Sequence, residues 1–557
     1  MSGEARPGFD RAARALALAA ALLGAWLYLG RLGGAHLQRG NEAMYAHPPV
    51  RMVATGDLLV PYWENRPFLD KPPLTFWALA ASYRVLGVSV LSSKLPGALA
   101  GLATALLLAA WVSRRSGARA GALAGLILLF SFQFLTVALT FAADIFLTLS
   151  VTLAVLALDA ACRNDADSDA RVGIVAGAAL ALAFYAKGLV GVALPAGAVA
   201  AGLLFYRAWP RRPWARGAWA AAALVALVAP WHVAMDHRLG AEFWRIFYWE
   251  NQFLRGATPR FMQVSRGPLY YLGILAWGAF PWAFLLPAAF FARRRPSVFP
   301  GWFVFGIVFW SALVMKREVY LVTVLPAVAA LVGEHLGGGA FARTWRRLAW
   351  ALGAAVAVGG VVLVARAAPG VAGLSGSRAP ALLLGLAVAA LAAALVAAAA
   401  RPESARLPFV VLLAAGLVLA ALQDLDLRLG RWDPLPEWGA RVRAECAAGC
   451  DGFLYGNNFN SIAFASGFDW TMVADPSRLS QSLSHDTAFV VMWTSDEGRL
   501  AGLPLRWEVV ERRKTFRGGL VPTAFGRGEG MDSLSLVRVT RSPVNPAAEG
   551  SLPPARP

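Results

Sequence analysis

Residues 41–73 form a polar stretch between two strongly apolar segments, and they contain side chains suited to acid–base and phosphate chemistry. Glu42 and Asp70 supply carboxylates, and Lys71 supplies a cation directly after Asp70. A carboxylate can take a proton from an acceptor hydroxyl, and a lysine ammonium can donate charge-assisted hydrogen bonds to phosphate oxygens. The stretch therefore predicts a reactive site at the edge of a membrane, with Tyr45 as a further side chain near it.

Further ionisable residues lie at the ends of later apolar segments. Ionisable groups are costly at membrane depth and usually face a cavity or a partner. The ones that the order of the spans places on the same side as residues 31–73 are Asp144, Lys187, Arg255, Lys316 and Arg317. Each also has a structural interpretation, because an acidic group such as Asp144 stabilises a helix amino terminus and a lysine can extend to the headgroups.

The composition predicts an integral membrane protein. Of the 557 residues 58% are hydrophobic and only 15% are charged, and the mean hydropathy is +0.54. About thirteen segments before residue 423 approach the roughly 20 apolar residues that a span needs. The net charge of +19 comes from short basic clusters between these segments, which the positive-inside rule makes cytoplasmic. This distribution argues against nucleic-acid binding.

We expect residues 1–422 to form a bundle of transmembrane helices, with residues 31–73 as an outer loop. From residue 423 short β-rich runs (GFLYG, TAFVVMW, WEVVERRKTF and LSLVRVT) alternate with helix-like pieces. That alternation predicts an extracytoplasmic α/β domain over residues 423–542, and the Pro-rich residues 543–557 are predicted to be disordered.

The helices that must position the site follow from the apolar pattern. The segment Leu74–Leu86 is amphipathic and predicts a helix in the membrane interface. The predicted spans next to the candidate residues are 92–111, 120–136, 143 onward, 172–187, 189–206, 268–291, 299–315 and 319–336. The short spans 172–187 and 189–206 are expected to meet at Lys187 and Gly188, on the outer side.

Cysteine and histidine usage gives little further direction. Cys446 and Cys450 lie in the predicted outer domain, where the spacing fits either a local disulfide or two free thiols on one helix face. The histidines on the outer side lack regular ligand spacing. The chain contains no Gly-rich phosphate loop and no zinc-spaced Cys/His cluster.

Several motifs together resemble the polyprenyl-phosphate-sugar-dependent membrane glycosyltransferases, the family of protein O-mannosyltransferases and aminoarabinose lipid A transferases. GDLLVP and DKPPLTFW in the first outer loop are followed in the family's order by AADIFLTL, FYAKGLVG, ENQFLRG, FPWAFLLP and KREVYLVTVLPAVAAL. The likeness covers roughly residues 10–340. The later tail is similar only in kind.

The resemblance implies a GT-C fold and the transfer of a polyprenyl-phosphate-linked sugar at the outer face of the bacterial cytoplasmic membrane. The acceptor would be lipid A, a glycan or a protein. We expect Glu42 to act as base or acceptor-orienting carboxylate, and Asp70 and Asp144 to orient groups or help to bind a metal, as catalytic residues. The residues expected around the substrates are Asn41, Tyr45, Lys71, Lys187, Arg255, Lys316, Arg317 and Tyr320. A divalent metal ion held by Glu42 and Asp70 is a further expectation, and no other cofactor is expected.

The first outer loop departs from the family at one position. The family often has Asp-Glu there, with the Asp in the catalytic role, whereas this chain has Asn41-Glu42. Because Asn cannot act as a base, either Glu42 takes that role, or the acceptor needs no base, or the activity differs. We favour Glu42.

Two other classes of function remain open from the sequence. A transporter or flippase of a lipid-linked substrate would place polar groups near the membrane midplane, whereas here they gather at one face. A catalytically silent assembly factor is conceivable because of Asn41. Only the enzyme would release sugar from its lipid onto a new product.

Overall fold

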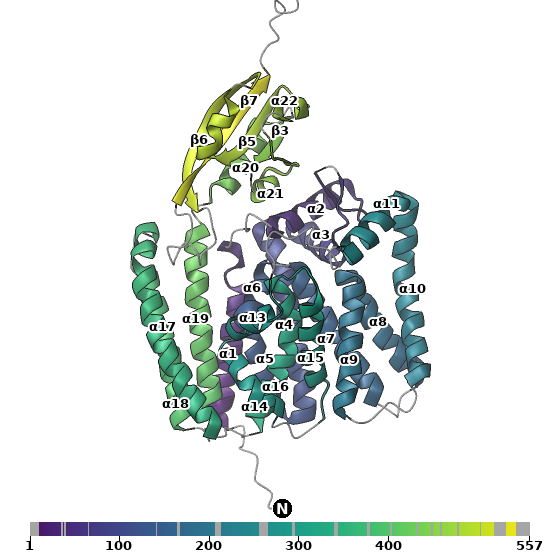
Figure 1. Ribbon diagram of the computed structural model, residues 1–557, viewed down its shortest axis with the longest axis vertical. Helices are drawn as coiled ribbons and strands as arrows, with labels where there is room; N and C mark the ends of the chain where they lie inside the picture. The colour runs from purple at the N-terminus through teal and green to yellow at the C-terminus, as the bar shows by residue number, and fades with distance from the viewer. Residues whose placement is uncertain are drawn as a thin grey trace, which may run out of the picture. The chain divides into compact units, whose positions relative to one another are not determined.

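The structure is a computed structural model (Figure 1) with two compact units. The membrane unit comprises Met1–Leu37 and Pro48–Gly430, and the C-terminal unit comprises Gln38–His47 and Arg431–Pro557. The structure describes residues 10–34, 37, 41–64, 66–140, 142–163, 168–206, 213–254, 266–291, 296–338, 343–375, 379–401, 404–430, 433–446, 449–456, 459–475, 478–501, 503–516 and 531–541.

The membrane unit is almost entirely helical. Its first half contains α1 (Arg11–Leu29), η1 (Leu32–Gly34), the later part of α2 (Asn41–Thr55), the short strands β1 (Tyr62–Trp63) and β2 (Arg66–Pro67), α3 (Leu74–Leu86), α4 (Val90–Ser116), α5 (Ala118–Leu129), α6 (Phe132–Thr140), α7 (Ala142–Arg163), α8 (Asp169–Lys187) and α9 (Leu189–Tyr206). Its second half contains α10 (Pro213–Leu239), α11 (Ala241–Phe243), the π-helix η2 (Trp244–Leu254), α13 (Tyr270–Gly278), η4 (Trp282–Leu285), α14 (Leu286–Phe291), α15 (Phe299–Ala312), η5 (Glu318–Val324), α16 (Leu325–Gly337), α17 (Arg343–Ser375), α18 (Ala379–Ala400) and α19 (Leu407–Gly430).

Many of these helices are long and apolar enough to cross a membrane. Within the described residues there are eight, or up to ten if each of two bent helix pairs is one span, and α3, Leu189–Phe205 and α15 are shorter apolar helices. The chain is therefore a multi-pass membrane protein, as its composition predicts. The total of about thirteen spans stays a prediction. Figure 1 shows α17, α18 and α19 side by side at one edge of the bundle.

Two predicted spans are broken in the structure. The segment expected as one span over residues 120–136 is α5 and α6, which are bent by 59°. The segment expected over 268–291 is α13 followed by Trp282–Phe291, with a bend of 111°. Pro281 lies at the second break, where it lacks the N–H that would continue the helix. Apolar periodicity does not register such a break, because both halves remain apolar.

Helix α8 is fixed at both ends, and this matters for the site. At its amino terminus the Ser168 hydroxyl accepts the backbone N–H of Arg171, which satisfies a free helix donor. Next to that end Asp169 pairs with Arg216 at 2.7 Å, and both side chains are largely buried. At the carboxyl terminus lies Lys187. A buried ion pair thus marks one end of α8 and a candidate site residue the other.

The C-terminal unit contains a five-stranded mixed sheet. Its elements are α20 (Leu435–Glu445), β3 (Asp451–Tyr455), α21 (Ser461–Ser466), β4 (Thr471–Val473), α22 (Leu479–Ser482), β5 (Thr487–Trp493), η7 (Thr494–Leu500), β6 (Leu505–Phe516) and β7 (Met531–Arg541). The strand order is β4-β3-β5-β7-β6; β3 is parallel to β4 and β5, and β7 is antiparallel to β5 and β6.

The strands of this sheet follow the β-rich runs of the sequence. TAFVVMW, WEVVERRKTF and LSLVRVT fall in β5, β6 and β7, and GFLYG falls in β3 except for its last residue. The buried pattern of β5 is nearly continuous, as expected for a central strand covered on both faces. The predicted combination of a helical membrane bundle with a small α/β domain is confirmed. Residues 543–557 lie outside the described residues.

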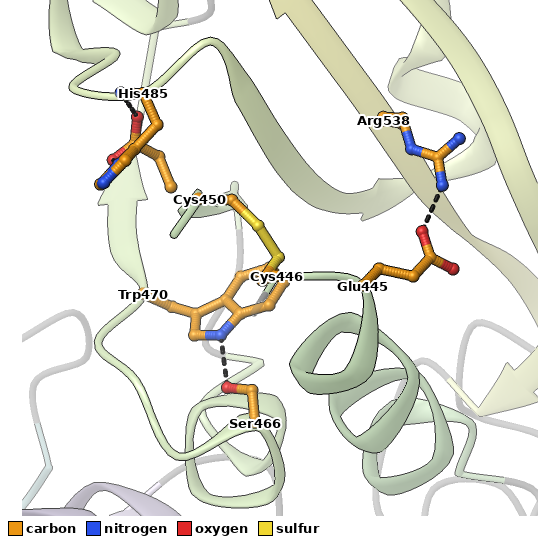
Figure 2. The surroundings of a disulfide bond; sticks show 8 residues. Glu445, Cys446, Cys450, Ser466, Trp470, His485 and Arg538 are labelled. Atoms are coloured by element: carbon orange, nitrogen blue, oxygen red, sulfur yellow. Dashed lines mark hydrogen bonds and ion pairs between the residues drawn. A yellow bond between two sulfur atoms is a disulfide. The ribbon is translucent and has the colours of Figure 1, made fainter. Parts of the chain in front are cut away.

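Cys446 and Cys450 form a disulfide (Figure 2). Their Cα atoms are 5.5 Å apart. The bond joins the end of α20 to the residue before β3. Of the two alternatives left open by the spacing, the structure shows the bridge, which is typical of proteins outside the reducing cytosol. Cys162 in α7 forms no disulfide with either of these two cysteines.

A buried carboxylate in the C-terminal unit predicts acid sensitivity. Glu497 accepts bonds from Arg512 Nε at 2.8 Å and Nη2 at 2.6 Å, and Ser535 also donates to it. The hydrogen bond from Arg512 holds the pKa of Glu497 below its usual range. A lowered folded-state pKa gives stability that is present above the unfolded-state value, about 4.3, and is lost as the pH falls through the folded-state value.

We therefore expect the amides of β6 and β7 in the full chain to exchange faster as the pH falls below the unfolded-state pKa of Glu497. The exchange rates are corrected for intrinsic exchange. Glu497→Gln should exchange faster than the wild type at neutral pH but respond less to acid, because Gln cannot be protonated. An acid response equal to that of the wild type would assign the effect to other carboxylates.

Candidate active site

The core of the candidate site is a buried ion pair between Asp144 and Lys187. Lys187 Nζ donates to Asp144 Oδ1 at 2.6 Å, and both side chains are 11% exposed. Asp144 lies in the first turn of α7, and Lys187 is the last residue of α8. Sequence analysis predicted both residues on the same side of the membrane; the structure places them in direct contact.

The chain turn after Lys187 is fixed by a glycine and by η2. Gly188 has φ +62°, a conformation that favours glycine, and a Cβ there would lie 2.7 Å from Gln252 Oε1. The same oxygen accepts the N–H of Leu189 at 3.1 Å. Gln252 belongs to the predicted motif ENQFLRG, so one role of that motif is to hold the break between α8 and α9.

Two aromatic rings cover the Lys187 ammonium. Lys187 Nζ lies 4.1 Å from the Tyr320 ring centroid and 5.4 Å from the Trp310 centroid, and the two rings stack at 4.6 Å. Such cation–π contacts stabilise a partly desolvated ammonium by about 1–2 kcal/mol. Tyr320 was a predicted substrate-binding residue. Trp310 was missed, because a tryptophan inside an apolar helix gives no polar signal.

Asp70 and Lys71 form a second ion pair in the same unit. Lys71 Nζ donates to Asp70 Oδ2 at 2.6 Å, and the two side chains are mostly buried. The positive charges of Lys71 and Arg317, besides that of Lys187, act electrostatically on Asp144. These five groups have one positive charge in excess. A cluster of this kind can hold a phosphate group, with the carboxylates orienting the ammonium groups.

The backbone that precedes Tyr320 is held by a hydrogen-bonded network. Arg266 Nη1 donates to the Lys316 carbonyl at 2.8 Å and to Glu318 Oε2 at 3.1 Å. The Tyr271 hydroxyl donates to the Arg317 carbonyl at 3.2 Å. Lys316 Nζ donates to the Leu313 carbonyl at 2.8 Å, so this predicted substrate ligand is seen bonded to its own chain segment.

The remaining predicted site residues lie in other parts of the chain. Glu42 and Tyr45 lie on the first half of α2, which groups with the C-terminal unit, and Glu42 is buried. Asn41 begins that helix. Arg255 lies outside the described residues.

The residues that the structure describes include no group of three or more His, Cys, Asp or Glu able to hold a metal ion. Asp70, one of the two expected ligands, is paired with Lys71. His232, one of the histidines predicted on the outer side, uses both ring nitrogens: Nδ1–H donates to the Val228 carbonyl at 2.9 Å, and Nε2 accepts from Tyr248. Burial raises the pKa of Tyr248 to about 12, so its hydroxyl keeps the proton that it donates.

Sequence reasoning also missed Lys94. This lysine in α4 is buried, and its Nζ donates to the Leu139 carbonyl at the end of α6 at 2.9 Å. The signal was available, because a lysine within an apolar helix must find a partner. Its helix neighbour Ser93 bonds the Tyr83 hydroxyl of α3 at 2.8 Å.

An apolar groove of about 520 Å³ runs along α3, the helix that begins shortly after Lys71. The groove is lined by Leu58, Leu59, Trp77, Ala80, Ala81 and Arg84. Trp77 Nε1 donates to the Leu58 carbonyl at 2.8 Å and so fixes one wall. The predicted interfacial helix Leu74–Leu86 is observed with the same limits. Its groove has the chemistry of a hydrocarbon-binding surface with one cation.

Parts of the chain are similar to known proteins. Residues 70–233 match the family described as dolichyl-phosphate-mannose-protein mannosyltransferase. An uncharacterised protein of Aquifex aeolicus is 29% identical over 320 residues, which are 56% of this chain and 62% of that protein. The undecaprenyl phosphate-α-4-amino-4-deoxy-L-arabinose arabinosyl transferase of Pseudomonas aeruginosa is 28% identical over 323 residues, covering 56% and 57%. The chain thus spans less than two thirds of the length of these relatives.

The fold itself is shared over nearly the whole chain. The crystal structure of ArnT from Cupriavidus metallidurans bound to undecaprenyl phosphate superposes with a TM-score of 0.74 and 22% identity, covering 94% of this chain and 98% of that one. The resemblance indicated by the sequence motifs is confirmed: the chain has the GT-C fold, and parts of it are similar to the protein mannosyltransferase family and to the aminoarabinose transferases.

Proposed function

We propose that this protein transfers a sugar from a polyprenyl phosphate carrier, such as undecaprenyl phosphate, to an acceptor at the outer face of a bacterial cytoplasmic membrane. The acceptor is a lipid A, a glycan or a protein. The observation that carries the proposal is the Asp144–Lys187 pair with Lys71 and Arg317 acting on it. It lies within a membrane unit whose residues 70–233 match a family described as using a lipid-phosphate-linked sugar.

The chemical step breaks the bond between the sugar anomeric carbon and the phosphate oxygen, and forms a bond from that carbon to an acceptor oxygen. The departing lipid phosphate keeps the electron pair and gains negative charge. Lys71, Lys187 and Arg317 stabilise this charge, because preorganised cations act on charge that develops in the transition state. Asp70 and Asp144 orient the two ammonium groups through their ion pairs.

The other substrate contacts are proposed from the sequence. Glu42 takes the proton of an acceptor hydroxyl; an acceptor phosphate is already nucleophilic and needs positioning alone. Arg255 and Lys316 add cations at the donor phosphate, and Asn41, Tyr45 and Tyr320 contact the sugar or the acceptor. The carboxylates Glu42 and Asp70 are the pair proposed for a divalent ion, but no step of this mechanism depends on one.

The groove along α3 supports a lipid-linked donor over a nucleotide sugar. Its walls are almost entirely apolar, and Arg84 is its one charged residue. Such a surface can hold an isoprenoid segment, because burying hydrocarbon is favourable by about 25 cal/mol per Å². It offers little to a nucleobase or ribose, which need polar partners.

Replacing Lys71 by Ala tests the phosphate-binding role. We expect kcat/KM for a radiolabelled polyprenyl-phosphate sugar to fall by about 10²-fold, because one cation at the departing phosphate is lost. Transfer is measured as label leaving the lipid and appearing in a cell-envelope acceptor. Full activity would remove Lys71 from the proposal.

A matched control for this variant is Arg238→Ala. Arg238 Nη2 pairs with Asp57 Oδ2 at 3.1 Å in the same unit, but its side chain is 57% exposed. Because exposed pairs contribute little, this variant should transfer sugar at the wild-type rate. Label that leaves the donor compartment without a new product, in any variant, would indicate a transporter.

A further inference from the structure

Helix α2 is divided in the middle by two prolines. Pro48 and Pro49 lie inside the helix, and proline has no N–H to bond the carbonyl four residues earlier. The carbonyls of Met44 and Tyr45 therefore lack their usual helical hydrogen bonds. The boundary between the two compact units falls at the same place, with residues 38–47 in the C-terminal unit.

The first half of α2 is fastened to the C-terminal unit by a buried histidine–aspartate pair. His47 Nε2–H donates to Asp469 Oδ1 at 3.0 Å, and the two side chains are only 4% and 16% exposed. The two residues are separated by 422 positions in the sequence. The contact therefore ties residues 41–47 to the α/β domain, within one compact unit.

The residue next to Asp469 in the chain is tightly packed. The neighbouring Trp470 is fully buried; its ring stacks on Phe468 at 5.7 Å, and its Nε1 donates to Ser466 Oγ at 2.9 Å (Figure 2). A Cβ at Gly452 in β3 would lie 2.6 Å from the Trp470 ring, so the indole packs directly on the strand backbone. The position of Asp469 is thus set by the sheet.

We infer that Asp469 is a positioning residue for sugar transfer. Acting through His47, it holds the first half of α2, and with it Glu42, in a fixed position within the C-terminal unit, and transfer requires that position. This inference rests on the proposed function and on Glu42 as its carboxylate. Glu42 precedes His47 by five residues on the same half-helix, and the prolines weaken the connection to the second half. Asp469 takes part in this way without contacting the substrate.

The experiment compares variants of the full chain in two measurements. Asp469→Ala removes the acceptor of the His47 bond, whereas Asp469→Asn keeps an oxygen that can accept Nε2–H. The first measurement is hydrogen exchange of the amides in residues 41–47, which is independent of activity. We expect exchange to be about tenfold faster in Asp469→Ala, because a buried charge-assisted bond is lost. Asp469→Asn should remain near the wild type.

The second measurement is steady-state transfer from a polyprenyl-phosphate sugar. Asp469→Ala should lower kcat by about 10- to 100-fold, as expected when a reacting group is misplaced, while KM for the donor stays within about twofold, because the altered pair does not bind the donor phosphate. Asp469→Asn should recover most of kcat. General unfolding of the protein would instead lower kcat in all variants together.

The matched control is His485→Ala. His485 Nδ1 contacts Asp451 Oδ1 at 3.0 Å, so the same unit contains a second histidine–aspartate pair of equal length, but its imidazole is 47% exposed. This variant should match the wild type in both measurements. His47→Ala combined with Asp469→Ala should lose no more kcat than either alone, because each acts through the other.

Equal exchange of residues 41–47 in the wild type and Asp469→Ala would overturn the inference, as would a wild-type kcat in that variant. Losses that multiply in the double variant would also overturn it. Failure of the wild-type chain to transfer sugar from any polyprenyl phosphate would instead overturn the proposed function, and the assignment to catalysis with it.

Discussion

Replacing Lys187 by Met should lower the rate of sugar transfer by about 10³-fold, since this cation is the centre of the candidate site. Its ammonium bonds Asp144 at 2.6 Å and lies over the rings of Tyr320 and Trp310. Met preserves the length and packing of the side chain but removes the charge, so the departing phosphate loses a donor that the fold had already oriented. The rate is measured as label transferred per mole of folded protein.

The same substitution should also destabilise the protein, and the two effects can be separated. Removing one partner of a buried pair leaves the other charge unpaired, which costs about 3–5 kcal/mol. Adding Asp144→Asn to Lys187→Met removes that unpaired charge. We expect the double variant to recover most of the thermal stability in detergent but none of the transfer activity. Recovery of both would mean that the pair is structural only.

A matched buried pair lies at the other end of the same helix. Arg216 and Asp169 are bonded at 2.7 Å with side chains 7% and 18% exposed, close to the burial of Asp144 and Lys187. Arg216→Met with Asp169→Asn should therefore change stability in a similar way while transfer per folded molecule stays near the wild-type value. Equal loss of transfer at both ends of α8 would contradict the assignment of Lys187 to catalysis.

Local features of this fold could be predicted because they depend on neighbours in the sequence. The helix Leu74–Leu86 was observed with its predicted limits because its apolar face and flanking prolines and glycine are local. The break at Gly188 was likewise predicted, since Lys187 and Gly188 separate two apolar segments in the sequence; in the structure Gly188 has a positive φ. The four β-rich runs of the C-terminal unit became strands for the same reason.

Contacts between distant segments could not be predicted in this way. The sequence placed Asp144 and Lys187 on one side of the membrane, but the direct bond across 43 positions depends on how α7 packs against α8. Trp310 is one of many aromatic residues in apolar helices, so nothing distinguished it. The bond between His47 and Asp469 joins residues far apart in the chain, and neither residue has a distinctive neighbourhood in the sequence.

The second large effect is expected from replacing Glu42, the residue beside Asn41, where the related family often has Asp. It concerns the proton of the acceptor. If Glu42 is the base, Glu42→Gln should lower transfer to a hydroxyl acceptor by about 10²- to 10⁴-fold, because Gln has the same shape but cannot take a proton. Transfer to an acceptor phosphate should be nearly unchanged, since no deprotonation is needed there. Comparing the two acceptor classes with one variant therefore identifies the acceptor chemistry as well as the base.

Asn41→Asp, introduced into the Glu42→Gln background, tests whether a carboxylate at the neighbouring position can replace it. The substitution restores the acidic residue that the related family often has there, and transfer to the hydroxyl acceptor should rise above that of Glu42→Gln alone. Glu64→Gln changes another glutamate of the same stretch and should leave the rate unaltered. Full activity of Glu42→Gln with every acceptor would show that the carboxylate is not the base, and would leave an acceptor already ionised as the chemistry compatible with Asn41.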